Sequence, residues 1–492
     1  MSTITASFYE LQLVYLVLVC AFFLFLDRQL SRRRRHSEHK SKPQQDISLL
    51  GDGVTNVTAG MGTAVSKLTR QYLTVYAIVM GSDWLQGPYI YSLYREQFSL
   101  PERLVAVLFV TGFTSAGLAA PLVGVWADQH GRRRLCLTFC VTYTLSCLSV
   151  LFPYYPILLL GRFLGGISTS ILYSAFESWL ISASSSLALS QSDLSGIMGH
   201  ASLVNGIVAA VAGVASNQLV ASTASFTTPF VASVALLLLA WVVIRGTWNE
   251  NYGSGGGAAA ATSDPLQLKR LGQALKIVRS EPSLLVIGLT QTCFEGSMYL
   301  FVFNWVPALQ ESAGSQNVLP LGYIFSAFMV SMMIGSLLYT SVVSICALFD
   351  PTAYEVTTAG SGGDGPLALH AKLSSLLCAI SALTFAVSIE SRDEHVRFWA
   401  FCTFEACVGA YYPVQGMLRG TLISNEHRAT LSSLFRVPLN VFVVVSLLTG
   451  VSSARYTVLT ASSLMLVLSS IVTGSFLVDH TPSFTSTAPH PA

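Results

Sequence analysis

Long apolar runs alternate with short polar connections along almost the whole chain. The first run covers residues 8–26, and each run has the length at which about 20 residues of helix cross roughly 30 Å of hydrocarbon. Closed β-barrels are the other fold that spans a membrane, but these runs are nearly twice as long as a barrel strand and do not alternate. Twelve further transmembrane helices, here called the core helices, are expected over 71–94, 102–126, 135–152, 157–182, 196–220, 226–246, 283–308, 319–347, 368–390, 396–418, 432–452 and 456–478.

The basic flank of the first run lies on its C-terminal side. Arg28 and Arg32–Arg35 follow the apolar residues, whereas a cleavable signal peptide carries its positive charge before them. We therefore expect a retained helix with its N-terminus outside the cell and its arginines in the cytosol. A helix that lies in the membrane interface is the alternative.

The short loops between the core helices give the same orientation. The connections 153–156 and 309–318 contain no Lys or Arg, and the connection at Arg392 is balanced by Asp393 and Glu394. Because cytosolic loops are enriched in Lys and Arg, the opposite side and the C-terminus are expected in the cytosol. The basic residues on that side are Arg132–Arg134, Arg245, Lys269, Arg270, Lys276, Arg279 and Arg428.

The longest internal polar segment, 248–282, contains a Gly/Ala-rich stretch typical of a flexible linker. It separates six core helices from six others. The segment 349–370 is a second soft insert, between the eighth and ninth core helices. The expected domains are an extra N-terminal helix (1–27), a flexible cytosolic segment (28–70), two six-helix bundles (71–247 and 283–478), the cytosolic linker between them (248–282) and a cytosolic tail (479–492).

Short matching motifs suggest that the two bundles are related. Gln86-Gly87 in the first core helix resembles Glu295-Gly296 in the seventh, and Phe176-Glu177 in the fourth resembles Phe404-Glu405 in the tenth. Together with the division into six and six, these matches favour a duplicated bundle whose binding site lies between the halves.

Composition excludes several classes of function. Of the 492 residues, 52% are hydrophobic and 11% are charged, against about 25% charged in a soluble domain. A net charge of +2 gives no reason to expect nucleic acid. The nine cysteines form no CxxC pair, and the glycine-rich stretches lack a P-loop lysine. We expect neither an enzyme nor a metal or cofactor site, and no loop that binds ATP.

One loop and one helix start carry a family signature. The loop reads Gly124-Val-Trp-Ala-Asp128-Gln-His-Gly131-Arg132-Arg133-Arg134, and the fourth core helix opens with Gly161-Arg162-Phe-Leu-Gly165-Gly166. Both resemble signatures of the major facilitator superfamily, although Gln129 stands where that family usually has a base. The resemblance implies an all-α membrane protein with the major facilitator fold, in which two six-helix bundles are related by pseudo-twofold symmetry, here with the extra N-terminal helix.

Longer motifs are similar to the eukaryotic molybdate-anion transporter family. They are Asp83-Trp-Leu-Gln-Gly-Pro-Tyr-Ile-Tyr91, Tyr173-Ser-Ala-Phe-Glu-Ser-Trp179, Trp248-Asn-Glu-Asn-Tyr252 and Phe435-Arg-Val-Pro-Leu439. This resemblance implies uptake of molybdate across a cell membrane, and we expect the plasma membrane, with an internal membrane as the alternative. Another oxyanion or a small organic solute as cargo, or a non-transporting receptor or scaffold, remain alternatives. We expect an oxyanion and the lipid bilayer as partners, no nucleic acid, and a monomer.

Four acids lie within the apolar runs: Asp83, Glu177, Glu295 and Glu405. A carboxylate at bilayer depth costs about 2.5–3.5 kcal/mol on insertion scales, so each is expected to face a cavity, to be paired or to carry a proton. Protonated acids would couple transport to protons and donate hydrogen bonds to an oxyanion. The alternative is a structural role in which they pair with Arg162, Arg419 or Arg436. Arg162 and Glu177 are about 22 Å apart along one helix, so the partner of Arg162 is expected on the first core helix or its neighbours.

Arg436 is the strongest candidate for binding the anion. It precedes Val437-Pro438, where proline frees a backbone carbonyl and the helix is expected to kink. Its fork of donors suits a tetrahedral oxyanion, although an interfacial arginine that reaches lipid phosphates is the alternative. Breaks are also expected at Gly87-Pro88 and at Tyr411–Pro413. Neutral donors expected to complete the binding site are Gln86, Tyr89, Gln291 and Tyr412.

The signature loop is expected to act as a cytosolic latch. Asp128 would cap the next helix and pair with bases across the interface of the halves. Membrane topology alone would explain the arginines, but not the acid and two glycines at this spacing. The residues assigned to the latch or to gating are Gly124, Asp128, Gly131, Arg132, Arg133, Arg134 and Arg162.

Overall fold

The computed structural model describes residues 2–41, 52–252, 276, 278–314, 318–349, 364–422, 428–449 and 455–478, and within them each expected apolar run is mainly helical. The first part comprises α1 (Ser2–Ser41), α2 (Asp52–Trp84), α3 (Ile90–Ser92), the π-helical turn η1 (Leu93–Gln97), α4 (Glu102–His130), α5 (Arg132–Ser149), α6 (Tyr155–Leu172), α7 (Ala175–Ser186), α8 (Gln191–Thr223) and α9 (Thr228–Thr247). The second comprises α11 (Pro282–Ala313), α12 (Leu321–Phe349), α14 (Asp364–Glu390), α15 (Glu394–Leu422), α16 (Arg428–Thr449), α17 (Arg455–Thr473) and the π-helical turn η3 (Gly474–Val478).

Apolar composition explains most of these helices. In the described part of the chain, nine are long and apolar enough to cross a membrane. Expected runs in α2, α5 and α15 fall outside this group because charged or polar residues interrupt them, and in α16 the apolar stretch Pro438–Leu448 is shorter. These more polar helices carry several of the candidate site residues, which is consistent with helices that face protein or water rather than lipid.

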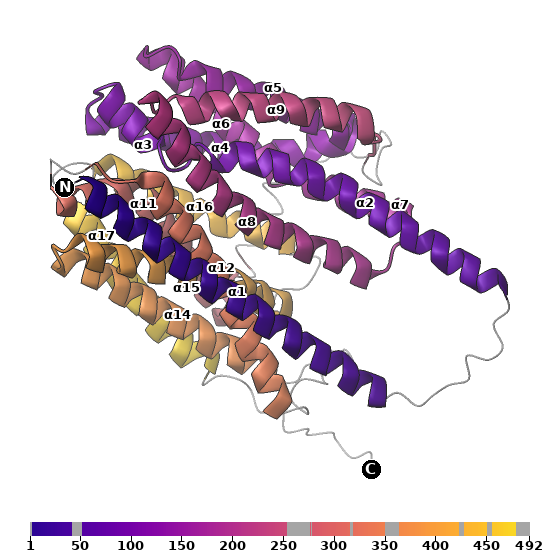
Figure 1. Ribbon diagram of the computed structural model, residues 1–492. Coiled ribbons are helices and arrows are strands. Elements are labelled where there is room, and N and C mark those ends of the chain that lie inside the picture. Colours follow the sequence, from indigo (N-terminus) through magenta and orange to yellow (C-terminus); the bar gives the residue numbers. More distant parts are fainter. Residues whose placement is uncertain are drawn as a thin grey trace.

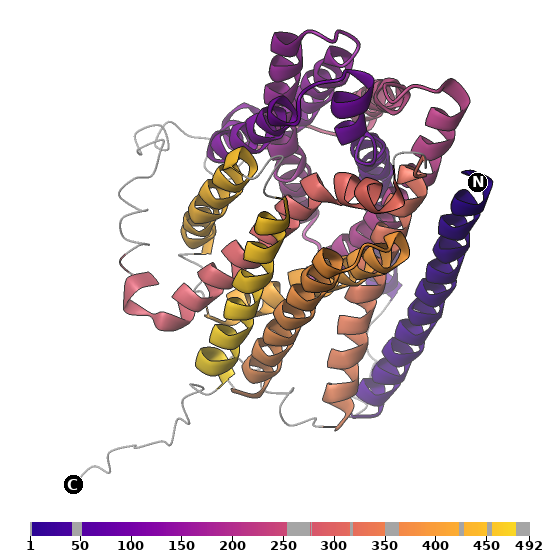
Figure 2. The same cartoon turned by 90° about the vertical axis from the view of Figure 1, so that its left-hand side faces the viewer.

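The two halves repeat the same packing. α2 packs against α8 and α9, and α11 packs against α16 and α17. Likewise α4 packs against α6 as α12 does against α15, and α5 contacts α6 and α9 as α14 contacts α15 and α17. The halves meet through α8 with α12 and through α4 with α16, which are also equivalent pairs. Figure 2 shows α2–α9 above and α11–α17 below. The fold is the expected pair of six-helix bundles with pseudo-twofold symmetry.

The extra helix α1 lies on the outside of this bundle, along α12 (Figures 1 and 2). Near its start, the ring of Phe8 lies 3.9 Å from that of His395, and the buried Tyr9 packs against Phe398. The expectation of a flexible segment over 28–70 is wrong for 28–41 and 52–70, which are helical. Lys, Arg and Gln are good helix formers, so a helix can continue beyond the apolar run; residues 42–51 lie outside the described part.

The two ends of the bundle carry different connections. We call the end with connections 98–101, 224–227 and 391–393 the outer end, after the orientation predicted from the sequence. The end with Gly131 and the 248–252 segment is called the inner end. The beginning of α1 lies at the outer end, because Phe8 and Tyr9 contact the start of α15.

Two core helices are broken. The first is interrupted over Leu85–Tyr89, at the expected Gly87-Pro88 position, because proline provides no backbone donor. The fourth is broken at Tyr173–Ser174, between α6 and α7, which the sequence did not predict. In contrast, α15 continues through Pro413, so the expected break there is wrong.

The residues after α9 belong to the first bundle rather than to the linker. Trp248 is 2% exposed, and its ring stacks on Trp179 at 3.7 Å. The Trp179 indole N–H donates to the Asn249 carbonyl, and the Asn251 side chain donates to the Trp179 carbonyl. The expected linker boundary at residue 248 is therefore wrong by several residues, and residues 253–275 lie outside the described part. The tail at 479–492 also lies outside it.

Candidate functional site

The halves are joined most closely at the outer end. The Gln310 side chain of α11 donates to Glu96 Oε1 of η1 at 2.7 Å, and the Gln218 side chain of α8 donates to the Tyr323 hydroxyl of α12 at 2.5 Å. One turn deeper, the Ser326 hydroxyl donates to the carbonyl oxygen of Ala210. Aromatic rings continue this contact toward the middle of the bundle, where Phe113 and Tyr299 lie 5.0 Å apart.

Toward the inner end, α8 and α15 each carry glycines that border open space. A Cβ added at Gly196 or Gly199 of α8, or at Gly416 or Gly420 of α15, would meet no atom within 4 Å. Figure 1 shows the inner ends of α1 and α2, at the right, well apart. Among the described residues, the contacts between the halves that hydrogen bonds make thus lie toward the outer end.

At the break in the fourth core helix, one tyrosine lies within electrostatic range of tyrosines of both halves. Tyr173 is 59% exposed although it lies in the middle of a membrane-spanning segment. It is close enough to interact electrostatically with Asp83 and Tyr76 of its own half and with Tyr299 and Tyr412 of the other. Tyr173 thus lies near tyrosines of both halves, and we call Tyr76, Tyr173, Tyr299 and Tyr412 the central tyrosine group.

Asp83 lies at the end of α2, directly before the break, and accepts a hydrogen bond from the Tyr143 hydroxyl of α5. Arg162 is close enough to interact with Asp83 and with Tyr94 of η1. Its Nε donates to the Leu108 carbonyl at 3.4 Å. Arg162 therefore has neighbours on the first core helix and its continuation, where its partner was sought.

Gln86 and Tyr89, expected among the substrate donors, are buried and engaged within the first bundle. The Gln86 side chain donates to the Ser82 carbonyl at 3.0 Å. The Tyr89 hydroxyl donates to Asn217 Oδ1 of α8 at 2.9 Å. The structure does not bring either side chain into the central tyrosine group.

In the second bundle, Glu295 is surrounded by polar groups of α11 and α15. Arg419 Nη2 lies 3.5 Å from Glu295 Oε1, so one of the expected acid–arginine pairs is present. Gln291 Nε2 donates to Glu295 Oε2 at 3.3 Å, and the Tyr411 hydroxyl donates to Oε1 at 3.5 Å. Next to Tyr411, Tyr412 is 48% exposed and its hydroxyl donates to the Met298 sulfur at 3.3 Å.

The remaining acids have different surroundings. Glu177 lies in the first turn of α7 and is exposed, within electrostatic range of Tyr72 and Tyr76. Glu405 is buried in α15, within electrostatic range of Tyr412. The side chains of Arg436, Gly124 and Asp128 lie outside the described part, so their expected roles remain predictions.

Glu250, which follows α9, caps the start of α5. Its carboxylate accepts from the backbone N–H of Arg133 at 2.8 Å and of Arg134 at 3.2 Å. Gly131 has φ of +100° and lies so close to Glu250 that a Cβ there would overlap the carboxylate. The Arg133 side chain donates to the Arg245 carbonyl of α9. These described contacts join α5 to the end of α9 within one bundle. The expected pairing of Asp128 across the halves stays a prediction, because its side chain lies outside the described part.

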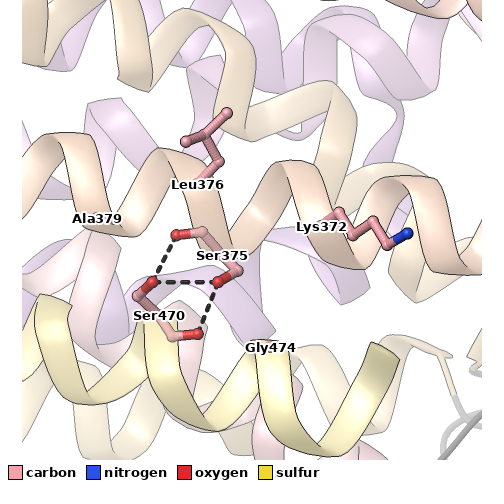
Figure 3. Close-up of a pocket in the computed structure, with 6 residues that line it drawn as sticks. All are labelled: Lys372, Ser375, Leu376, Ala379, Ser470 and Gly474. Atoms are coloured by element: carbon pink, nitrogen blue, oxygen red, sulfur yellow. Dashed lines mark hydrogen bonds between the residues drawn. The ribbon is translucent and has the colours of Figure 1, made fainter. Parts of the chain in front are cut away.

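A pocket of about 380 Å³ lies elsewhere, between α14 and α17 (Figure 3). It is lined by Lys372, Ser375, Leu376, Ala379, Ser470 and Gly474. The Ser375 hydroxyl donates a hydrogen bond to the Ser470 carbonyl, and the Ser470 hydroxyl donates one to the Ser375 carbonyl. No residue assigned to the site from the sequence lines this pocket. No group of three or more potential metal ligands occurs among the described residues.

Sequence reasoning missed several residues that the structure brings forward. Tyr173 was not assigned to the site, because nothing in its apolar run marks the break. Tyr143 contacts Asp83 from another helix. Arg397 is 3% exposed, and its guanidinium donates to carbonyls of Ser388, Ser391 and Ala308. The position of Arg397 inside an apolar run could have marked it as a buried, hydrogen-bonded residue.

Comparison with known proteins gives a consistent family. A family model described as sugar transporters with 12 transmembrane segments matches residues 51–346. Molybdate-anion transporters of Takifugu rubripes and Danio rerio are 31% and 30% identical to this chain, and each alignment covers 80% of it and 81% of the relative. The solved structures of the nucleoside transporter NupG and of the peptide transporter POT in complex with sulfate are similar in fold. Each has a TM-score of 0.59 and 11% sequence identity to this chain. The alignments cover 83% of this chain, 98% of NupG and 93% of POT.

Proposed function

Because the chain belongs to the molybdate-anion transporter family of the major facilitator superfamily, we propose that it carries molybdate into the cell as a proton-coupled secondary active transporter. The observation that carries this proposal is the identity of 30–31% to molybdate-anion transporters over 80% of the chain. We place it in the plasma membrane as a monomer, with the Gly131 loop and the inner end in the cytosol. Its site would lie at the central tyrosine group and the neighbouring charged residues.

The arrangement of the halves supports transport by alternating access. Contacts such as Gln310–Glu96 and Gln218–Tyr323 join the outer ends, while the glycine faces of α8 and α15 are open at the inner ends. A rocking motion of the halves would break the contacts at the outer ends and bring the glycine faces of α8 and α15 together at the inner ends. The structure would then correspond to the inward-facing state.

The polar groups support an anion as cargo. Neutral hydroxyls of Tyr173, Tyr299 and Tyr412 come from both halves, so an oxyanion that binds among them would be contacted by both. Arg162 and Arg419 lie on either side and each has an acid as neighbour. This alternation of acids and arginines is what a proton-coupled anion carrier needs, because the protonation of an acid frees its arginine for the anion.

The uptake of molybdate by cells that lack their own molybdate transporter tests the proposal. Cells that display the protein at their surface should accumulate molybdenum, measured by mass spectrometry, above cells with an empty vector. Equal accumulation at a verified surface level would contradict it. Excess sulfate added to the same cells separates the possible oxyanions, because only a shared carrier would show competition.

A sugar or other organic solute is the second candidate, favoured by the description of the matching family model. Competition in the same cells distinguishes it. Inhibition of molybdenum uptake by a panel of monosaccharides, together with uptake of the labelled sugar itself, would favour this candidate. We expect neither.

A further inference from the structure

The proposed function leaves open which residue of the second bundle holds the anion, and we propose that it is Arg419, for which Glu295 competes. The proposal rests on the proposed function and on the contact between α11 and α15. Polar residues on α11 are spaced by four (Gln291 and Glu295), and those on α15 also by four (Tyr411, Gln415 and Arg419), so each set lies on one face of its helix.

These two faces meet within the bundle. Gln291 and Tyr411 both donate to Glu295, at 3.3 and 3.5 Å, and Arg419 pairs with it at 3.5 Å. These distances exceed the usual range of about 2.7–3.2 Å for hydrogen bonds from nitrogen and about 2.5–3.0 Å for those from a hydroxyl, so the contacts are weak. A pair held at such distances can exchange its partner more readily than a short bidentate one, because less interaction is lost.

Several polar atoms in this cluster have no partner among the described residues. Gln415 is 0% exposed, and neither its amide nitrogen nor its amide oxygen is hydrogen-bonded. Gln291 Oε1 and Arg419 Nε are also buried without a partner. Buried polar groups are almost always satisfied, so unpaired ones in one place point to a bound molecule with several hydrogen-bonding atoms.

The unpaired donors fit a tetrahedral oxyanion. Arg419 offers Nε beside the Nη2 that contacts Glu295, and the two can bind two oxygens of one anion side by side. Gln415 adds an amide donor one helical turn away on the same helix. The unpaired amide oxygens of Gln291 and Gln415 accept hydrogen bonds from waters that accompany the anion or from protonated Glu295.

The cluster borders the space between the halves. Tyr412 is 48% exposed and close enough to interact electrostatically with Glu295, Arg419 and Glu405, and it also belongs to the central tyrosine group. Arg419 is itself partly exposed. An anion can therefore pass from the open space to Arg419 without crossing an apolar layer of described residues.

Because the Glu295 carboxylate and the anion compete for Arg419, protonation of Glu295 and binding of the anion are coupled. With Glu295 ionised, Arg419 is paired and the anion would meet a negative charge. One proton taken up by the Glu295 carboxylate removes that charge, and Arg419 turns to the anion. The proton leaves when the anion leaves, so one proton accompanies each anion. Ionisable groups that the structure places near Glu295 are Arg419, Tyr411 and Tyr412 of α15.

Binding of molybdate to the purified protein, measured by isothermal titration calorimetry between pH 5.5 and 8, tests this assignment. Wild-type protein should bind more tightly as the pH falls and take up about one proton per anion. Arg419→Gln should weaken binding at least tenfold at every pH, and Arg419→Lys should restore part of it. Glu295→Gln should bind with an affinity that no longer depends on pH and without proton uptake. Arg392→Gln, an exposed arginine of the outer end, is the control for loss of charge and should match wild type.

Transport in proteoliposomes provides the second measurement. Glu295→Gln should still exchange molybdate for molybdate but should not accumulate it in response to a pH gradient. If Arg419→Gln binds like wild type, or if Glu295→Gln keeps gradient-driven accumulation, the assignment is overturned while the proposed function stands. A wild-type protein that neither binds nor transports molybdate would overturn both. Should Arg419→Gln fail to fold, the Glu295→Gln measurements still decide, because that change conserves size and hydrogen bonding.

Discussion

Glu250 links the end of the first bundle to the start of α5, and its two oxygens each accept from one backbone N–H. The first N–H groups of a helix have no partner within the helix, and a carboxylate is well suited to satisfy them. The glycine at 131 is required here because a Cβ would overlap that carboxylate. The signature loop and the Trp248–Tyr252 motif, 117 residues apart, therefore form one structural unit.

We predict that Glu250→Ala lowers the stability of the protein by about 1–2 kcal/mol, the usual cost of losing a helix cap. Thermal unfolding in detergent, followed by tryptophan fluorescence, measures the change. Glu281→Ala is the matched control, because Glu281 precedes α11 but makes no capping hydrogen bond with its side chain. Equal melting temperatures for the two variants would contradict this role.

Arg397 has a comparable role at the outer end. It donates to carbonyls of α11, of α14 and of the connection after it, at 2.7–2.9 Å. We predict that Arg397→Ala costs about 3 kcal/mol, since several buried carbonyls lose a charged donor. The exposed Arg392, replaced by alanine, should unfold like wild type. The melting temperature in detergent distinguishes the two variants. An unchanged melting temperature for Arg397→Ala would contradict this role and would show that water replaces the guanidinium.

At the scale of elements, the close approach of α12 and α15 depends on glycine. A Cβ at Gly335 would overlap the carbonyl oxygen of Ala406, and one at Gly409 would overlap that of Met332. Small residues allow backbones to approach within membrane bundles. The two glycines thus hold these helices together at corresponding positions.

Gly335→Ala and Gly409→Ala should each destabilise the protein by about 1–3 kcal/mol, as overpacking usually does. Gly416→Ala, also on α15, should leave stability unchanged because a Cβ there meets nothing. The fraction of monodisperse protein after heating, measured by size-exclusion chromatography, compares the three. A loss for Gly416→Ala as large as that for Gly409→Ala would contradict the packing.

How far sequence predicts these elements depends on whether the cause is local. Apolar length and the proline at 88 act locally, so the helices and the break at Leu85–Tyr89 could be predicted. The break at Tyr173 and the Glu250 cap depend on contacts between distant segments, which periodicity does not report. For the same reason Gln86 and Tyr89 were expected to face substrate, although Tyr89 binds Asn217 of another helix. The Glu295–Arg419 pair was one of several possible pairings, and only packing selects it.

At the scale of the whole molecule, the outer ends must separate for the anion to enter from outside. Gln218 and Tyr323 touch across the halves at 2.5 Å. We predict that the double variant Gln218→Cys and Tyr323→Cys, joined by a short cleavable cross-linker, loses transport. Cleavage of the linker should restore it, and each single variant treated alike should transport throughout. Transport by the cross-linked protein would contradict an outer opening at this place.

The most direct test of the account uses purified protein in liposomes with an imposed pH gradient, acidic on the side that corresponds to the outer end. We predict that molybdate accumulates on the other side above its equilibrium level and that accumulation stops when the gradient is dissipated. Liposomes with folded, monodisperse protein that take up no more molybdate than empty ones would contradict the central claim.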